Sequence, residues 1–267
     1  TQKLIDEPYY PKTALASKRM LMVIGGMLGT GGLVLTVVLL SFFLDSSIKS
    51  GKNATKLTTL PVAGGWLNED AISKSIYLDE LHNNQIKLFY NNLSMHFPEN
   101  GQKIILFYSH QKGEGKTFLI DHLVKELTRQ NRSTIFCGNE ADAKKVVCES
   151  LVIDEQTISN PKKESYFWEE TLTKLPHEFV LWELPNIKEK PFNYSLINKS
   201  NVLVLVTDAG RSWTSSDAFI NNGITEMVKT SHLVWLNKMQ ADELEDINGE
   251  IPKKRSSIRT KFKQLLS

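Results

Sequence analysis

The pattern of hydrophobic and polar residues divides the chain into one long uncharged stretch and a later series of short apolar runs. Residues 20–44 form a stretch of 25 residues without a charged side chain. As a helix this stretch would be roughly 38 Å long, which is enough to cross a ~30 Å hydrocarbon core with some tilt. The pattern therefore predicts one transmembrane helix. Its length and late start favour a membrane anchor over a cleaved signal peptide.

The short apolar runs begin after residue 100 and alternate with helix-like segments. Residues 103–108 predict a strand, and residues 117–130 carry apolar side chains on one helical face. Further runs of strand length occupy residues 133–137, 151–153, 179–182, 202–206 and 233–236, and helical patterns cover residues 84–97, 141–148 and 163–175. This alternation predicts an α/β domain with a mainly parallel sheet.

A phosphate-loop sequence, HQKGEGKT, follows the strand at residues 103–108 directly. In such a loop the backbone N–H groups, here those of Gly113, Glu114 and Gly115, cradle phosphates. Lys116 would pair with the β- and γ-phosphates of ATP or ADP, and the Thr117 hydroxyl would contact Mg²⁺. The strand before the loop and the helix after it support a P-loop NTPase-like fold. The first glycine of the full motif is replaced by a histidine at position 110.

A phosphotransferase also needs carboxylates at the ends of neighbouring strands to hold Mg²⁺. The strand after the phosphate-loop helix ends in Cys137-Gly138-Asn139, which offers no acid. Residues 179–182 are followed by Glu183, the candidate for both the catalytic and the Mg²⁺-side carboxylate, although its side chain is one methylene longer than Asp. Asp154 and Glu155 form a competing pair that we expect to be a loop or strand-end feature.

Asn237 follows the apolar run 233–236 and is placed to contact a purine base of the nucleotide. Guanine selection by an Asn-Lys-x-Asp pattern would need an acid at position 240, where Gln240 stands. The sequence therefore favours adenine over guanine.

The remaining segments predict the domain organisation. Residues 1–19 are a short N-terminal stub, and residues 45–75 are polar and rich in small residues, which is typical of a linker. The P-loop domain then covers residues 76–251. Residues 252–267 are basic, contain no acid and predict an amphipathic tail that either lies on an anionic membrane surface or packs on the domain.

Charge and cysteine content limit the possible partners and the compartment. A net charge of +2 provides no general basic field, so we expect no nucleic-acid partner. Two cysteines are too few for a disulfide framework, and nucleotides are cytoplasmic. We therefore expect the C-terminal domain in the cytoplasm and the N-terminal side in the periplasm. Four basic residues before the apolar stretch and three after it do not decide the orientation by themselves.

Two further features bear on assembly and on the extent of the chain. Gly25 and Gly29 form a Gly-xxx-Gly pair, which either allows two membrane helices to pack closely or reflects the ordinary frequency of glycine in such helices. The chain starts at Thr1, which is typical of a piece of a longer protein or of a processed product.

In this order, the pieces resemble the membrane-anchored polysaccharide co-polymerases and their fused bacterial tyrosine kinases, the Wzz/GumC/Wzc group and the BY-kinases. Residues 11–66 resemble the second membrane helix of that family, with FFLDSSIKS after the helix and LPVAGGW before the domain. The segments that match the kinase domain in order are NNLSMHF, SHQKGEGKT, SNPKKESYFWEETLTKLPHEFVLWELP and NVLVLVTDAGRS. The resemblance implies a bacterial inner-membrane protein that binds ATP or ADP with Mg²⁺. It also implies a homo-oligomer, formed through the membrane helix and the cytoplasmic domain, that works with a polysaccharide polymerase and export machinery.

The sequence departs from the family pattern at positions that matter for catalysis. The second Walker motif of the family, Asp-x-Asp, falls on residues 137–139, and its Walker B Asp falls on Glu183. The oligomer-contact signature falls on residues 84–90 and is mostly lost. No tyrosine occurs after Tyr194, so the C-terminal tyrosine cluster is absent.

These departures favour a catalytically degenerate co-polymerase subunit that controls chain length and export of an exopolysaccharide or capsule. The alternative is an active ATP-dependent tyrosine autokinase that uses Lys116, Thr117 and Glu183. An unrelated membrane-anchored P-loop ATPase is a third interpretation.

Overall fold

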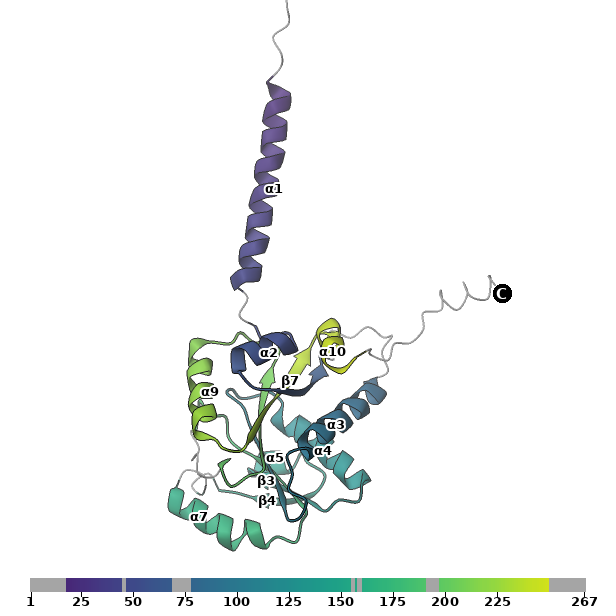
Figure 1. Ribbon diagram of the computed structural model, residues 1–267, viewed down its shortest axis with the longest axis vertical. Coiled ribbons are helices and arrows are strands. Elements are labelled where there is room, and N and C mark those ends of the chain that lie inside the picture. The colour runs from purple at the N-terminus through teal and green to yellow at the C-terminus, as the bar shows by residue number, and fades with distance from the viewer. Residues whose placement is uncertain are drawn as a thin grey trace, which may run out of the picture. The chain divides into compact units, whose positions relative to one another are not determined.

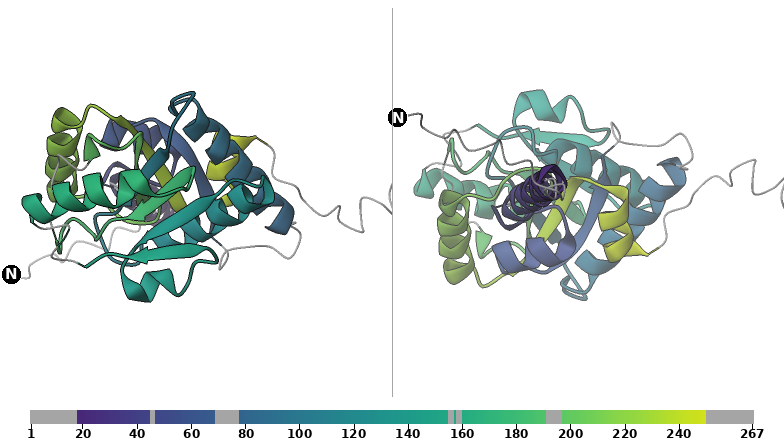
Figure 2. Two further views of the ribbon diagram at one scale, coloured as in Figure 1. Left: turned by 90° about the horizontal axis from the view of Figure 1, so that it is seen from below. Right: turned by 90° about the horizontal axis from the view of Figure 1, so that it is seen from above.

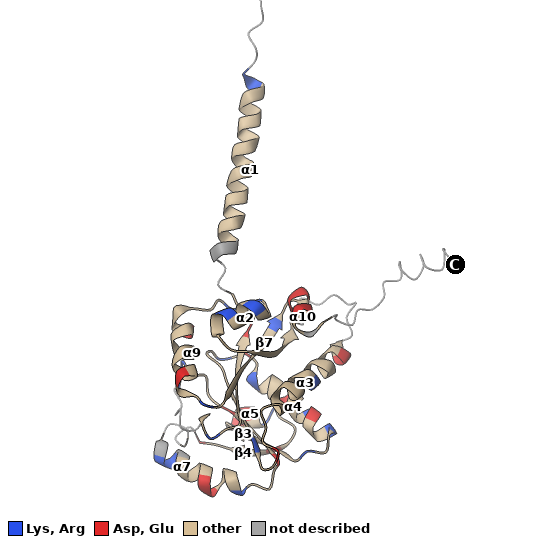
Figure 3. Ribbon diagram, viewed as in Figure 1, with Lys and Arg blue, Asp and Glu red and all other residues tan. Residues whose placement is uncertain are grey.

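The computed structural model describes residues 18–44, 47–68, 78–154, 157, 160–190 and 197–249. The chain divides into two compact units, residues 1–46 and residues 47–267. The first unit contains the helix α1 (Arg19–Leu44), which is drawn in purple in Figure 1. Among the described residues, this is the one helix long and apolar enough to span a membrane. Figure 3 shows that its described side chains carry no charge after Arg19. The helix predicted over residues 20–44 is therefore confirmed.

The second unit is built on a seven-stranded sheet in the order β1-β7-β6-β2-β5-β3-β4. Each neighbouring pair of strands is parallel. The strands are β1 (Val62–Leu67), β2 (Lys103–Tyr108), β3 (Thr134–Gly138), β4 (Glu149–Val152), β5 (Phe179–Glu183), β6 (Val202–Asp208) and β7 (Ser231–Met239). The predicted α/β class with a parallel sheet is confirmed.

Helices cover both faces of this sheet (Figures 1 and 2). The helices are α2 (Gly51–Thr58), α3 (Leu78–Ser94), α4 (Lys116–Arg129), α5 (Glu140–Ala143), α7 (Pro161–Glu170), the 3₁₀ turn η2 (Leu172–Lys174), α9 (Ser215–Met227) and α10 (Ala241–Asn248). One buried apolar core joins α3 and α4 to the sheet, and a second joins α2, α7, α9 and α10 to it. The unit is thus a three-layer α/β/α sandwich.

The predicted linker over residues 45–75 is wrong for residues 47–68. These residues form α2 and then β1, which extends the sheet by pairing with β7. The linker was predicted here because the two glycines of β1 are typical of turns. Gly64 instead allows the ring of Trp235 to lie against the backbone, since a Cβ at this position would be 2.6 Å from the ring. Residues 69–77 lie outside the described residues.

The other predicted elements shift at their ends. The helix predicted over residues 84–97 begins earlier, at Leu78, and the strand predicted over residues 151–153 is β4. Only α5 is helical within the segment predicted over residues 141–148, because the chain turns there toward β4. Residues 1–17 and the basic tail at residues 252–267 lie outside the described residues.

Candidate nucleotide-binding site

The phosphate loop lies where β2 ends and α4 begins. β2 is flanked by β5 and β6 in the sheet, so the loop lies at the carboxyl edge where open α/β sheets bind ligands. Gly113 and Gly115 have φ values of +83° and +90°, in the left-handed region that glycine adopts without steric cost. Gly115 is the N-cap of α4 and provides no side-chain cap, so the first amides of this helix are available to a ligand.

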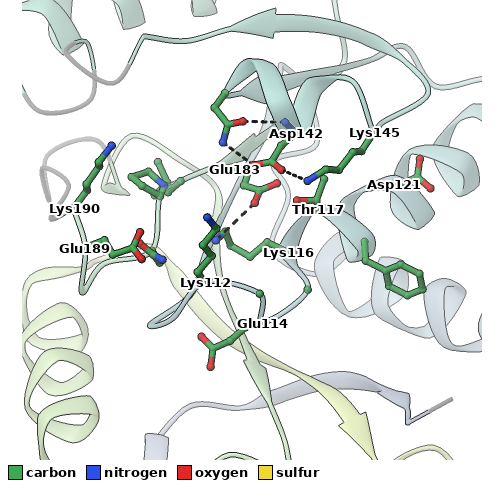
Figure 4. A pocket seen from close by; sticks show the side chains of 17 residues that line it. Lys112, Glu114, Lys116, Thr117, Asp121, Asp142, Lys145, Glu183, Glu189 and Lys190 are labelled. Atoms are coloured by element: carbon green, nitrogen blue, oxygen red, sulfur yellow. Dashed lines mark hydrogen bonds and ion pairs between the residues drawn. The ribbon is translucent and has the colours of Figure 1, made fainter. Parts of the chain in front are cut away.

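A pocket of about 690 Å³ opens at this edge of the sheet (Figure 4). It is lined by the phosphate loop, the first turns of α4, the region around α5 and the loop that follows β5. Its charged lining residues are Lys112, Glu114, Lys116, Asp121, Asp142, Lys145, Glu183, Glu189 and Lys190. The sequence prediction identified Lys116, Thr117 and Glu183, and the structure brings these three together in this pocket.

Lys116 projects from the first position of α4 toward the carboxyl ends of β2 and β5. Its Nζ donates a hydrogen bond to Oγ of Ser109 over 2.8 Å and lies 3.7 Å from Oε1 of Glu183. The ammonium group is therefore held at the base of the pocket, beside the amides that would cradle phosphate. This is the position from which it can pair with phosphate oxygens.

Glu183 ends β5 and is buried, and the sheet register places it beside Phe107 of β2. Its Oε2 has no hydrogen-bond partner among the described residues. Burial raises the pKa of Glu183 to about 7, although the positive charge of Lys116 and a hydrogen bond from Thr117 act in the opposite direction. A buried carboxylate with a free oxygen is a group that a bound cation would stabilise.

Asp142 is a functional candidate that the sequence analysis missed. It lies in the first turn of α5, where Asn139 is the N-cap and accepts a hydrogen bond from the Asp142 amide over 2.9 Å. Burial opposes ionisation, but hydrogen bonds from Lys145, Asn139 and Thr117 hold the pKa of Asp142 below its usual value. The signal in the sequence was Asn-x-x-Asp at a strand end, which is the pattern of a capped helix start.

The two carboxylates and Thr117 fit a Mg²⁺ ion. Thr117, Asp142 and Glu183 all line the pocket, where Thr117 lies beside the two acids (Figure 4). Carboxylate and hydroxyl oxygens are the ligands that this hard cation prefers, together with water and phosphate oxygens. Cys137 is not a candidate ligand, because burial raises its pKa to about 12 and keeps the thiol protonated.

The structure places Asn237 and the Glu114 side chain behind the phosphate loop. Asn237 is buried, is absent from the described lining of the pocket, and donates from Nδ2 to the carbonyl oxygen of Glu114 over 2.7 Å. In this arrangement it supports the phosphate loop from behind. The Glu114 carboxylate turns toward the protein interior, where it lies 2.7 Å from Nε of Arg211 and accepts from the Gln111 amide over 2.8 Å. Only the backbone of Glu114 remains for phosphate.

Asp154 is not among the described residues that line the pocket. Its carbonyl oxygen accepts a hydrogen bond from the amide of Thr157 in the segment after β4. Glu155 lies outside the described residues.

The sequence matches no protein-family model and no curated protein. The structure resembles the kinase domain of Escherichia coli tyrosine kinase ETK with a TM-score of 0.51 at 10% identity, over 79% of this chain and 96% of that chain. It also resembles the chimerical protein CapA2B2 with a TM-score of 0.52 at 13% identity, over 72% of this chain and 100% of that chain. At these identities the likeness shows a shared fold: the described part of the second unit has the fold of that kinase domain.

Proposed function

We propose that this chain is a membrane-anchored, polysaccharide co-polymerase-like subunit whose kinase-like domain binds Mg²⁺-nucleotide without phosphorylating tyrosine. The subunit acts in chain-length control and export of an exopolysaccharide or capsule. The proposal combines the pocket geometry, the helix α1 and the order of family-like segments along the sequence.

The observation that carries nucleotide binding is the convergence of Lys116, Thr117, Asp142 and Glu183 in one pocket. The backbone of residues 113–117 and the Lys116 ammonium bind the β- and γ-phosphates of ATP or ADP. Thr117, Asp142 and Glu183 hold the Mg²⁺, directly or through its water molecules. The bound Mg²⁺ supplies positive charge against the phosphates. Lys145, which lies 2.7 Å from Asp142, adds a further positive charge to the pocket.

The absence of phosphoryl transfer rests on how the acids are held. Asp142 already accepts hydrogen bonds from Asn139 and Lys145, over 2.6 Å and 2.7 Å. It lies on a helix rather than at the strand end, where the family has its Asp-x-Asp motif and this chain has residues 137–139. Glu183 reaches the Mg²⁺ from a side chain that is one methylene longer than Asp. Transfer depends on tightly positioned charge, so these substitutions favour binding over catalysis.

The helix α1 supports a place in the bacterial inner membrane, with residues 1–19 in the periplasm and residues 67–267 in the cytoplasm. The partners are further copies of this chain, through the membrane helix and the domain, and the polysaccharide polymerase and export machinery. The topology is tested by labelling single cysteines, Tyr10→Cys and Lys162→Cys, in a background that carries Cys137→Ala and Cys148→Ala. Labelling of both positions from the same side of the membrane would exclude this orientation.

The second candidate function is an active tyrosine kinase, and two observations favour it. A carboxylate with a pKa near 7 suits a general base that works at neutral pH, and Glu183 has that value. Asp142 also restores one of the two acids that the sequence had lost. The two candidates therefore differ in chemistry but share the same Mg²⁺-nucleotide site.

Nucleotide binding is tested by calorimetric titration of the full chain in lipid nanodiscs with ATP, in Mg²⁺ and in EDTA. Wild type should bind in Mg²⁺, and Lys116→Ala should remove most of that binding. The exposed Lys125→Ala, on the same helix α4, is the matched control and should bind as wild type does. Equal binding by wild type and Lys116→Ala would contradict the proposal.

A further inference from the structure

Asp217 is a buried acid at the start of α9 that receives an unusual number of partners. Its Oδ1 lies 2.8 Å from Nδ1 of His110 and 2.7 Å from Nζ of Lys188. Its Oδ2 accepts from a terminal guanidinium nitrogen of Arg211 over 2.8 Å and from the amide and hydroxyl of Thr214 over 2.9 Å and 2.6 Å. The side chain is fully buried.

These partners come from three separate loops at the carboxyl edge of the sheet. His110 belongs to the phosphate loop after β2, Lys188 to the loop after β5, and Arg211 to the loop after β6. The loop after β5 supplies one side of the nucleotide pocket through residues 184–186, 189 and 190. Lys188, in contrast, turns away from the pocket toward Asp217. A single carboxylate therefore fastens two walls of the pocket to each other.

The formal charges of the acidic and basic side chains in this cluster cancel. Asp217 and Glu114 are the two acids, and Lys188 and Arg211 are the two bases, with Arg211 bridging both acids. Burial lowers the pKa of His110 even though Asp217 raises it, and Nδ1 of the imidazole lies within hydrogen-bond distance of the Asp217 carboxylate. Hydrogen bonds from Lys188, Thr214 and Arg211 outweigh the effect of burial and hold the pKa of Asp217 far below its usual value.

His110 occupies the position at which the full phosphate-loop motif has glycine. Glycine has no side chain with which to anchor the loop, whereas His110 reaches Asp217 and stacks on Trp213 at 5.0 Å between ring centroids. The substitution thus joins the first residue of the loop to the cap of α9. His110, which departs from the phosphate-loop motif, and the buried Asp217 are therefore partners in the same contact.

We propose that Asp217 is a positioning residue for the nucleotide site, which holds the phosphate loop and the loop after β5 in their binding arrangement. The proposal rests on the proposed function, because it names the group that shapes the same pocket. Asp217 does not touch the nucleotide. It acts through His110 and Arg211 on the phosphate loop, and through Lys188 on the opposite wall.

The test compares Asp217→Asn with Thr214→Ala in the full chain in nanodiscs. Both variants remove hydrogen bonds at the same cap, but only Asp217→Asn removes the charge shared by the loops. Removing one member of such a charge network leaves its partners unpaired, so we expect the Kd for Mg²⁺-ATP to rise on the order of 10-fold or more. Thr214→Ala should leave this Kd within about twofold of wild type, because the three loop contacts remain.

Hydrogen exchange on the nucleotide-free protein separates positioning from general destabilisation. Asp217→Asn should speed exchange in residues 110–115 and 184–190 while β3 and α3 remain protected. Lys188→Met removes only the ion pair between Lys188 and Asp217. It should speed exchange in residues 184–190 but not in residues 110–115. This variant keeps the test decisive if Asp217→Asn does not fold. An unchanged exchange pattern in both variants, or an equal loss of affinity in Thr214→Ala, would overturn the proposal. If wild type binds no Mg²⁺-ATP, the proposed function fails, and the exchange data still decide whether Asp217 orders the loops.

Discussion

The side-chain amide of Asn139 donates a hydrogen bond to Oδ2 of Asp142 over 2.6 Å and so holds a carboxylate over the phosphate pocket. Asn139 falls on a strand-end position at which the sequence resemblance implies an acid. The carboxylate of this chain lies three residues further along, in the first turn of α5. This relationship changes the chemistry expected from the sequence, because two carboxylates rather than one, those of Asp142 and Glu183, are candidates to hold Mg²⁺.

The first prediction concerns the contribution of Asp142 to metal binding. Asp142→Asn keeps the size and the cap of α5 but removes a charged ligand for Mg²⁺ or its water molecules. We expect the ratio of ATP affinities in Mg²⁺ and in EDTA to fall by about 10-fold, the lower end of the effect of removing a group that supports a metal. Calorimetric titrations of ATP under the two conditions measure this ratio.

Glu140→Gln is the matched control for this prediction. Glu140 lies in the same turn of α5, is exposed, and pairs with Lys144 rather than with the pocket. The variant should have the wild-type ratio. If Asp142→Asn and Glu140→Gln behave alike, Asp142 does not contribute to the metal site.

The second prediction concerns the pH dependence of stability at Glu183. Its pKa in the folded protein is about 7, above its ordinary value of 4.5, so the folded state binds the proton more tightly than the unfolded state does. This group therefore costs stability as the pH rises from 4.5 to 7. We expect Glu183→Gln to increase the free energy of unfolding at pH 8 by on the order of 2 kcal/mol and to change it little at pH 4.5. Urea unfolding at both pH values provides the measurement.

Glu178, which directly precedes the same strand β5, provides the opposite case. A hydrogen bond from Lys103 holds the pKa of Glu178 below its usual value, so its stabilising effect is present at neutral pH and is lost as the pH falls. Glu178→Gln should therefore lower stability at pH 8 and have little effect at pH 3. The same sign of change at pH 8 in both variants would contradict the assignment of Glu183 as a buried, strained acid.

The third prediction compares the two left-handed glycines of the phosphate loop. A Cβ at Gly113 would have nothing within 4 Å, whereas a Cβ at Gly115 would overlap the side-chain nitrogen of Asn237. Gly113→Ala should therefore cost about 1 kcal/mol of stability from backbone strain alone. Gly115→Ala should cost a further 1–3 kcal/mol, roughly, from the overlap and should displace the loop from Asn237. Thermal unfolding and ATP titration of the two variants test this difference, and equal effects would contradict it.

The sequence predicted the parallel α/β fold and the phosphate loop because both depend on local patterns. Each of the six apolar runs and the Gly-Lys-Thr signature lies within a short stretch of sequence, and β2 to β7 and α4 form where these stretches predicted them. The edge strand β1 could not be predicted in the same way. Its pattern of small residues is suited to the large side chains of β7, which are about 170 residues distant along the chain.

The site was only partly predictable for the same physical reason. Glu183 is the last residue of β5, and Lys116 and Thr117 begin the helix after the phosphate loop, so the fold class alone brings them together. Asp142 reaches the pocket through a helix cap, and Asn237 turns away from it because its amide satisfies a backbone carbonyl of the loop. The contacts of Asp217 join residues that are 107 positions apart in the case of His110. No local pattern in the sequence indicates contacts between residues so far apart.

The last prediction is that the protein binds Mg²⁺-ATP but does not phosphorylate its own tyrosines. Binding needs only the backbone of residues 113–117, the Lys116 charge and a cation held near Thr117. Transfer also needs a fully charged and fixed metal shell, and the loss of one such element typically costs orders of magnitude in rate. Here Asp142 is shared with Lys145, and Glu183 reaches the metal from a side chain one methylene longer than Asp.

Purified chain in nanodiscs, incubated with Mg²⁺-ATP, should give no phosphotyrosine above the Lys116→Ala control by mass spectrometry. The informative double variant is Cys137→Asp with Asn139→Asp, which places acids at the two strand-end positions where the sequence resemblance implies them. Because Asn139 also caps α5, the pair is compared with Asn139→Asp alone, which keeps a capping oxygen. A signal in wild type that disappears in both Lys116→Ala and Glu183→Gln would show an active kinase. A phosphotyrosine signal that arises only in the double variant would show that residues 137–139 prevent phosphoryl transfer while the pocket still binds nucleotide.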